Sequence, residues 1–95
     1  MLSSKLCQVF FALSGYERAA FRKFVQSPFH NQRADIIKFF EYLNQKTNDA
    51  SIDLNKEAVF AFVYPDEAYE DKKMRYLLNF MLELVEDFFV VRAAL

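Results

Sequence analysis

Apolar side chains recur at alternating intervals of four and three residues through the last third of the chain, from Asp71 to Leu95. This spacing places them along one side of a helix, so the segment is predicted to form a single long amphipathic helix. We expect the other segments to pack on this helix. Its apolar stripe consists of Met74, Leu78, Met81, Val85 and Phe88, and it is widened by Leu77, Leu84 and Val91.

Two shorter helices are predicted in the first third of the chain, and the first of them spans Ser3 to Leu13. Ser14 and Glu17 then have the spacing of a capping box, in which each side chain bonds the backbone N–H of the other residue, so a second helix begins there. Pro28 disfavours helical geometry at the residue before it and ends this helix. The residues expected to face inward are Leu6, Val9, Phe10 and Leu13 in the first helix, and Tyr16, Ala20, Phe21, Phe24 and Val25 in the second.

Two more helices are predicted in the middle of the chain. One begins at Asn31 or Asp35 and ends in the polar run from Asn44 to Ser51, which we expect to be a loop. The next has Asn55 as its N-cap and ends before Pro65. Because this helix is short and very apolar, we expect it to be buried. The residues expected to face inward are Ile36, Ile37, Phe39, Phe40 and Leu43, and then Ala58, Val59, Phe60, Phe62 and Val63.

The composition favours helices over strands. The 95 residues include one Gly and two Pro, which leaves little of the turn chemistry that β-hairpins need. Hydrophobic residues make up 54% of the chain, so one core can form, but the length leaves no room for a second. We therefore predict one all-α domain over residues 1–95, built as an irregular bundle of four or five helices with a long C-terminal helix.

The compartment is predicted from cysteine usage and hydropathy. Cys7 is the single cysteine, so the chain has no internal disulfide and a reducing compartment is expected. No stretch approaches the roughly 18 uncharged apolar residues that a membrane helix needs. We expect a cytoplasmic protein that does not have the membrane as a partner.

Charge is divided unevenly along the chain. Residues 1–46 carry seven Lys and Arg against three Asp and Glu, whereas residues 47–95 carry five against ten. Two interpretations remain open. The two halves attract each other within the fold, or the molecule makes head-to-tail contacts with another charged surface.

Candidate chemistry is sparse. His30 is the single histidine, and its neighbours have no recognised spacing for a nucleophile or an acid–base pair, so a turn or surface role is predicted. Glu83, Glu86 and Asp87 lie close together without the Glu-x-x-His pairs of di-iron sites. Acidic residues within 66–71 complement the dipole of the helix that follows. We predict no catalytic residue, metal ligand or cofactor, and we expect that the protein is not an enzyme.

An alternative from another class is a helix-turn-helix-like DNA-binding domain. Arg18, Arg22 and Lys23 form a candidate basic surface, and the first two share a helix side at i and i+4. The link between the second and third helices is longer than the usual turn, and the isoelectric point is near 5.8. Nucleic acid is therefore the less favoured partner.

This alternative predicts binding to duplex DNA that weakens steeply as salt concentration rises, because phosphate contacts release counterions. Binding should also weaken when Arg18→Ala and Arg22→Ala are combined. A titration with labelled duplex at several salt concentrations measures both effects, and unaltered binding by the double variant would exclude the proposed basic surface.

Two sets of residues form a distinctive pattern. The first is Leu13–Glu17, Phe21, Phe24 and Ser27–Asn31, and the second is Val59–Pro65, Asp71–Arg75 and Leu84–Phe88. Through these residues the chain resembles the amino-terminal region of a group of larger uncharacterised bacterial proteins, in which a leucine-serine start leads to a glutamate, a phenylalanine-rich helix and a serine-proline-aromatic turn that ends in asparagine. The resemblance implies no activity, but it implies that the natural protein continues beyond Leu95.

The chain ends in a strongly apolar run without a helix-ending Gly, Asn or Pro. Such an end has to be covered, either by the chain's own downstream residues or by a second copy, which would make this segment a homo-oligomer. The predicted function is a protein-interaction or assembly module without catalytic activity. Its candidate interface residues are Phe89, Val90, Val91, Ala94 and Leu95.

Overall fold

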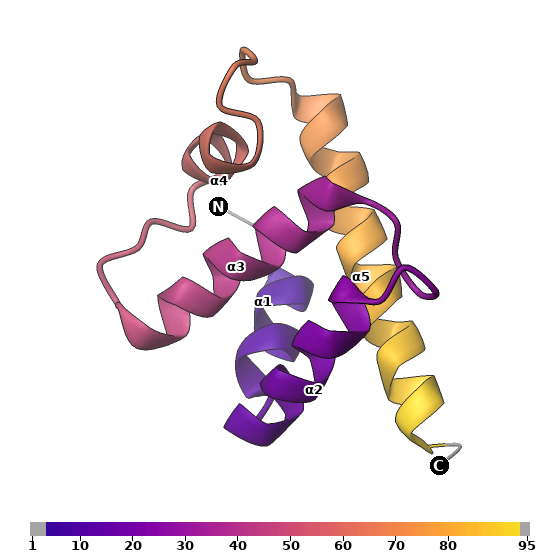
Figure 1. The fold of residues 1–95 in the computed structure, drawn as a ribbon. Helices are drawn as coiled ribbons and strands as arrows, with labels where there is room; N and C mark the ends of the chain where they lie inside the picture. The colour runs from indigo at the N-terminus through magenta and orange to yellow at the C-terminus, as the bar shows by residue number, and fades with distance from the viewer. Residues whose placement is uncertain (1–3, 94–95) are drawn as a thin grey trace.

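The long helix predicted from the apolar stripe is α5, which spans Asp71–Ala93 and follows one side of the molecule (Figure 1). Its 23 residues extend for about 34 Å at 1.5 Å per residue. The computed structural model describes residues 4–93, and the longest dimension of the molecule is 41 Å. Helices α1, α2 and α3 pack along the inner side of α5, whereas α4 packs against α3. The described residues contain no strand. The all-α prediction is confirmed.

The inner side of α5 is the predicted stripe with one exception. Val91 was expected to be covered, but it is 38% exposed. Val91 is on the same side of α5 as the stripe, but it lies beyond Phe88, the last stripe residue that the neighbouring helices enclose. It is therefore only partly covered. The stripe residues that are buried are Met74, Leu77, Leu78, Met81, Leu84, Val85 and Phe88.

Helices α1, at Ser4–Ala12, and α2, at Gly15–Gln26, are separated by the predicted capping box. The Ser14 N–H donates to Glu17 Oε1 at 2.8 Å, and the Glu17 N–H donates to Ser14 Oγ at 3.1 Å. The expectation that Tyr16 faces inward is wrong. Its side chain is 77% exposed, because the first turn of α2 projects past the core toward the end of α5.

Helix α3, at Ala34–Asn48, differs from its prediction at both ends. Arg33 is the N-cap residue and makes no side-chain cap hydrogen bond. Asn31 instead braces the link from α2, because its buried amide donates to Val25 O at 2.8 Å and its Oδ1 accepts from the Arg33 N–H at 3.0 Å.

At its other end, α3 continues through residues that were predicted to be loop. Gln45 and Lys46 are good helix formers, and a lysine in the last turn favours the negative end of the helix dipole. The Lys46 ammonium also donates to Ala50 O at 2.6 Å. Polarity alone therefore gave the wrong end for this helix.

Helix α4, at Lys56–Val63, has the predicted cap, because Asn55 Oδ1 accepts from the Glu57 N–H at 2.8 Å. The expectation that Phe62 faces inward is wrong. Its ring is exposed and lies 5.1 Å from the ring of Tyr42, a residue of α3 that the sequence pattern did not predict to be buried.

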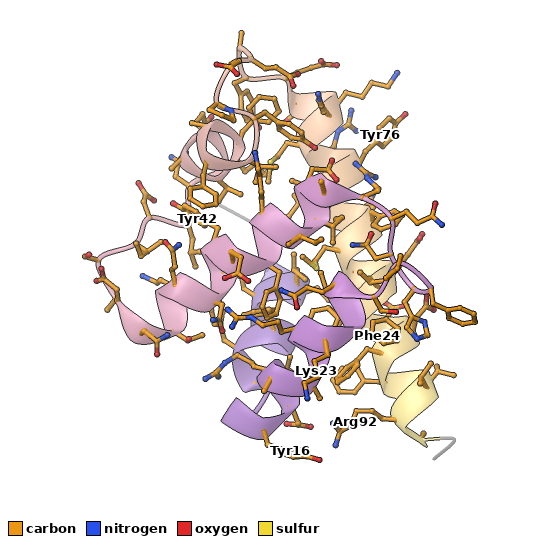
Figure 2. All side chains as sticks on the ribbon, viewed as in Figure 1. Tyr16, Lys23, Phe24, Tyr42, Tyr76 and Arg92 are labelled. Atoms are coloured by element: carbon orange, nitrogen blue, oxygen red, sulfur yellow. The ribbon has the colours of Figure 1, made fainter. Side chains whose placement is uncertain are left out.

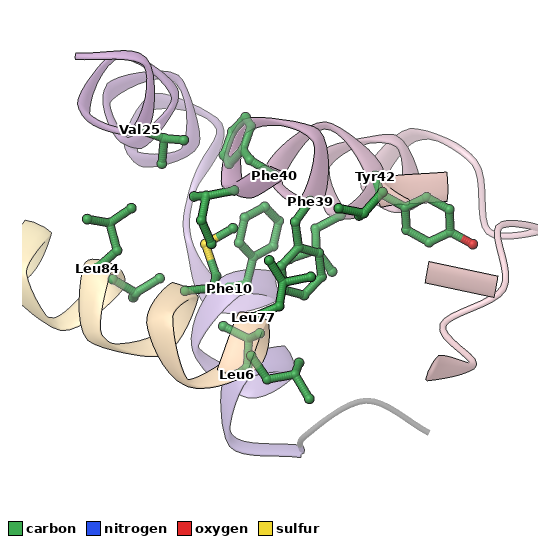
Figure 3. Close-up of a cluster of buried hydrophobic side chains, with 14 of the residues drawn as sticks. Leu6, Phe10, Val25, Phe39, Phe40, Tyr42, Leu77 and Leu84 are labelled. Atoms are coloured by element: carbon green, nitrogen blue, oxygen red, sulfur yellow. The ribbon is translucent and has the colours of Figure 1, made fainter. Parts of the chain in front are cut away.

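Aromatic rings join the helices at the centre. The rings of Phe10, Phe21 and Phe40 come from α1, α2 and α3, and their centroids lie 5.7 to 6.5 Å apart with edge-on geometry. Phe88 of α5 joins them at 5.1 Å from Phe21. Figure 3 shows part of this core, in which Phe10, Phe40 and Leu77 are labelled.

Replacing Phe21 with Ala should lower the free energy of unfolding by about 3–5 kcal/mol, because the ring is fully buried and its loss leaves a cavity. Phe62→Ala is the matched control, since this ring is exposed, and it should cost about 1 kcal/mol or less. Denaturant unfolding followed by circular dichroism measures both. Similar losses for the two variants would contradict the described core.

Candidate interaction surface

The last turn of α5 carries three consecutive apolar residues that the rest of the described chain leaves partly uncovered. Phe89 is 40% exposed, Val90 is 69% exposed and Val91 is 38% exposed. We call these three residues the terminal patch. Ala94 and Leu95, the other two predicted interface residues, lie outside the described residues.

Because successive helix residues are rotated by about 100°, the terminal patch faces three directions. Val91 faces α2 and lines a groove there, whereas Phe89 faces α1 and lines a separate hollow. Val90 lies between them and points outward. The end of α5 therefore presents an apolar ridge with a depression on each side.

The depression between α2 and α5, the α2/α5 groove, has a volume of about 530 Å³. Its base is aromatic. The rings of Phe24 and Phe88 lie 5.5 Å apart, and the imidazole of His30 stacks on Phe24 at 4.1 Å with an interplanar angle of 14°. Ala20 and Val91 contribute further apolar surface, so the groove is suited to apolar side chains.

The rim of the same groove is cationic. Lys23 lines it from α2, and Arg92 lines it from α5 (Figure 2). The Arg92 guanidinium lies 5.6 Å from the ring centroid of Tyr16 and 5.5 Å from that of Phe88, which holds the charge over two aromatic rings. None of the residues that line the groove is Asp or Glu.

The depression on the other side, the α1/α5 hollow, has a volume of about 350 Å³ and is mainly apolar. Val9, Ala12 and Leu13 line it from α1 and the start of the link, and Phe89 lines it from α5. With the α2/α5 groove, it surrounds the exposed end of α5 with apolar surface from two other helices.

Phe29 is an exposed aromatic residue that sequence reasoning did not assign to an interface. It is 90% exposed in the link between α2 and α3, and its ring lies 5.2 Å from His30, which lines the α2/α5 groove. The sequence did carry a signal, namely a large aromatic residue in a polar turn with no periodic partner. Its position beside the groove depends on the fold.

All three residues of the predicted basic surface line one hollow, between α2 and α3. The Arg18 guanidinium donates to Leu13 O at 3.1 Å, and that of Arg22 donates to Glu41 of α3 at 2.9 Å. The hollow between α2 and α3 has a volume of about 430 Å³. Lys23 also lines the α2/α5 groove. The structure thus joins Lys23 to the predicted interface residue Val91, and directs the arginines elsewhere.

The acidic residues before α5 have partners close by in the sequence. Glu67 accepts from the Lys73 ammonium at 2.6 Å, and Asp71 lies 3.4 Å from the Arg75 guanidinium. Among residues 4–93, every ion pair joins two residues within 1–46 or two within 47–95. Within residues 4–93, the basic first half and the acidic second half are therefore not joined by ion pairs.

Three ionisable groups with shifted pKa values, Arg33, Asp35 and Tyr64, form a polar cluster away from the terminal patch. Asp35 accepts from the Arg33 guanidinium at 2.7 Å and from the Tyr64 hydroxyl at 2.6 Å. Burial by itself would raise the pKa of Asp35. The hydrogen bonds from Arg33 and Tyr64, together with the positive charge of Arg33, outweigh burial and lower this pKa below its usual value. Burial, and then the hydrogen bond to Asp35, raise the pKa of Tyr64.

This cluster has a structural explanation. It connects the first turn of α3 to the residue that ends α4, and the Arg33 guanidinium also lies 4.7 Å from the ring centroid of Phe80 on α5. Shifted pKa values often mark active sites. Here each shift follows from burial and a satisfied hydrogen bond, so the cluster serves to hold three helices together.

The described part of the chain offers few other sites. Within residues 4–93, no group of three or more His, Cys, Asp or Glu side chains is arranged to hold a metal ion. Of the helices described, none has the length and apolar character needed to cross a membrane. Comparisons with protein families, with curated proteins and with solved structures found no match to this chain. The surface around the end of α5 is therefore the strongest candidate site.

Asp35→Asn should lower the free energy of unfolding by about 1–3 kcal/mol at neutral pH, because a charged acceptor is lost. Since the pKa of Asp35 is lower in the folded chain, its stabilising contribution is complete above the unfolded pKa of about 3.9. The contribution disappears as the pH falls through the folded value. Denaturant unfolding at pH values from about 7 to 2 should show a smaller acid-induced loss in the variant.

The matched control for this prediction is Asp66→Asn, which changes an exposed carboxylate in the turn before α5. It should follow the wild-type pH profile. An Asp35→Asn profile that is parallel to wild type through the acid range would show that Asp35 does not carry the coupling.

Proposed function

We propose that this chain is a protein-interaction module without catalytic activity, and that it self-associates through the C-terminal end of α5. The observation that carries the proposal is the exposure of Val90 at 69% on a ridge between two apolar depressions. Single exposed apolar residues are ordinary, whereas a continuous apolar surface with concave neighbours is typical of a binding site.

A second copy is the occupant that fits this surface best, because the ridge and the depressions lie at the same end of the molecule. In a two-fold dimer, the same surface on both copies meets itself, so the ridge of each can enter a depression of the other. Full burial of a valine or phenylalanine side chain contributes about 1.5–3 kcal/mol. The terminal patch supplies three such residues from each copy, and the residues that line the depressions supply more.

The same surface predicts the composition of the interface. Phe24, Phe88 and Tyr16 provide aromatic groups of the type that is enriched at the centres of protein interfaces. Arg92 is stacked on two of these rings, which keeps its long side chain ordered before association. Less flexibility is then lost on binding. These features favour binding of a protein surface over binding of a small polar ligand.

Val90→Glu should shift the chain toward the monomer, because it places a charge in the centre of the proposed interface. Light scattering coupled to size-exclusion chromatography, over roughly ten to several hundred micromolar protein, measures the mass. We expect wild type to approach the dimer mass as concentration rises, and Val90→Glu to weaken association by at least tenfold, equivalent to about 1.4 kcal/mol.

Tyr76→Glu is the control, because it adds the same charge to an exposed residue on α5 near the opposite end of the helix. It should leave the concentration dependence unchanged. A wild-type chain that remains monomeric at several hundred micromolar, or a Val90→Glu variant that associates like wild type, contradicts the proposed self-association.

A further inference from the structure

The α2/α5 groove has positive charge on both of its sides. Lys23 lines it from α2 and Arg92 lines it from α5, and among the described residues no carboxylate lines it (Figure 2). Within residues 4–93, no ion pair includes either cation. Hydrogen bonds from Ser14, and then the charge of Arg92, lower the pKa of Glu17, but Glu17 lines the α1/α5 hollow and not this groove. The groove therefore offers two cations to a ligand.

The base of the groove is apolar and aromatic. The stacked rings of Phe24 and His30 lie beside the ring of Phe88, and Ala20 and Val91 add aliphatic surface. The volume of about 530 Å³ lies within the range of about 300–1,000 Å³ that is usual for ligand pockets. A ligand that fits this groove has an apolar part for the base and negative charges for the rim.

Apolar surface continues outside the groove. Phe29 is 90% exposed, and its ring lies 5.2 Å from that of His30, which lines the groove. Tyr16 also lines the groove, and most of its side chain faces solvent. A ligand that covers both rings as well as the base has to be longer than a single aromatic group. This extent favours a peptide segment over a small molecule.

We propose that the α2/α5 groove binds an acidic segment of another protein, with an aromatic side chain on the base and carboxylates against Lys23 and Arg92. Hydrogen bonds between such oppositely charged groups are stronger than those between neutral ones. An aromatic anchor in a pocket, with polar contacts around it, is also the usual anatomy of a protein interface. The inference goes beyond the proposed self-association, because neither Phe89 nor Val90 lines this groove.

A second copy in a two-fold arrangement fits this particular groove less well. Two grooves that face each other across the axis would bring Lys23 and Arg92 of both copies together, and no carboxylate of the lining would separate these charges. Like charges placed opposite one another disfavour such a contact. The ridge of a second copy is better suited to the α1/α5 hollow, which is mainly apolar and has no cation in its lining.

The acidic turn of a second copy, at residues 66–71, is the other candidate occupant. It contains four carboxylates and one aromatic residue, Tyr69. Glu67 and Asp71 already pair with basic residues of α5. The Tyr69 ring lies 5.3 Å from that of Phe60, and its hydroxyl donates to Asp71 at 3.1 Å. The turn would have to give up these contacts to enter the groove, which favours a segment from another protein.

A synthetic peptide tests the chemistry of the ligand. The probe is a short dye-labelled peptide with one central phenylalanine flanked on both sides by glutamates, titrated with the full 95-residue chain at low salt. Fluorescence anisotropy measures the dissociation constant. Replacing the glutamates of the probe with glutamine should raise this constant about tenfold, and replacing its phenylalanine with serine should raise it at least tenfold. Binding of the acidic probe should also weaken as salt concentration rises.

Charge reversal on the protein tests the location of the site. Lys23→Glu and Arg92→Glu, made separately, should each raise the dissociation constant of the acidic probe about tenfold, because each replaces an attraction with a repulsion. Lys23→Arg keeps the charge and should stay within about threefold of wild type. Lys38→Glu is the matched control, since it makes the same charge change at an exposed residue of α3 that does not line the groove. It should also stay within about threefold.

The outcomes separate this inference from the proposed function. Binding that needs both the acidic residues of the probe and the two groove cations supports the inference, even if the chain alone is monomeric. Binding that ignores both charge reversals, or no binding at roughly several hundred micromolar protein, overturns it and leaves self-association standing. If the probe does not bind and Lys23→Glu instead changes the sedimentation mass of the chain alone, a second copy occupies the groove and the inference is wrong. Circular dichroism of each variant confirms that the helices are intact.

Discussion

The structure depends on the contact of four phenylalanine rings, one from each of α1, α2, α3 and α5. Phe21 occupies the centre of this group, with Phe10, Phe40 and Phe88 around it at 5.1 to 6.5 Å. Helices of 9, 12 and 15 residues are marginal by themselves in water, so α1, α2 and α3 require this packing to persist. The rings hold the short helices against α5 and determine how far along α5 the core extends.

The extent of the core explains the candidate site. Phe88 is the last residue of α5 that the other helices enclose, and the next three residues are also large and apolar. They project between α1 and α2, whose own ends leave a depression on each side. The apolar surface is thus a direct consequence of a helix that continues beyond the core it supports. The proposed self-association covers the part of the helix that the fold leaves uncovered.

Local and periodic features of the fold could be predicted from the sequence. The stripe on α5, the capping box at Ser14 and Glu17, and the cap at Asn55 depend on residues within a few positions of one another. The end of α3 was misplaced for a local reason, whereas the errors at Tyr16 and Val91 arose where distant contacts decide the outcome. Tyr16 and Val91 have the right periodicity for burial, but they lie past the end of the core, and a helical pattern carries no information on where neighbouring helices stop.

The candidate site could be predicted only in part for the same reason. The apolar end of α5 is visible in the sequence, whereas the α2/α5 groove joins Lys23 to Val91 across most of the chain. Arg18 and Arg22 looked equivalent to Lys23, yet the contact of Arg22 with Glu41 turns that side of α2 toward α3. Which residues share a surface becomes clear only from the packing of α2 between α3 and α5.

The central claim is that the fold itself covers α5 as far as Phe88, and that a second copy covers the helix beyond it. Residue-resolved hydrogen exchange along α5, at low and high protein concentration, tests this most directly. Amides from Met74 to Phe88 should exchange only through global unfolding, even at low protein concentration. Amides from Phe89 to Arg92 should become protected only as the protein concentration rises. Equal protection along the whole helix, independent of concentration, would contradict the account.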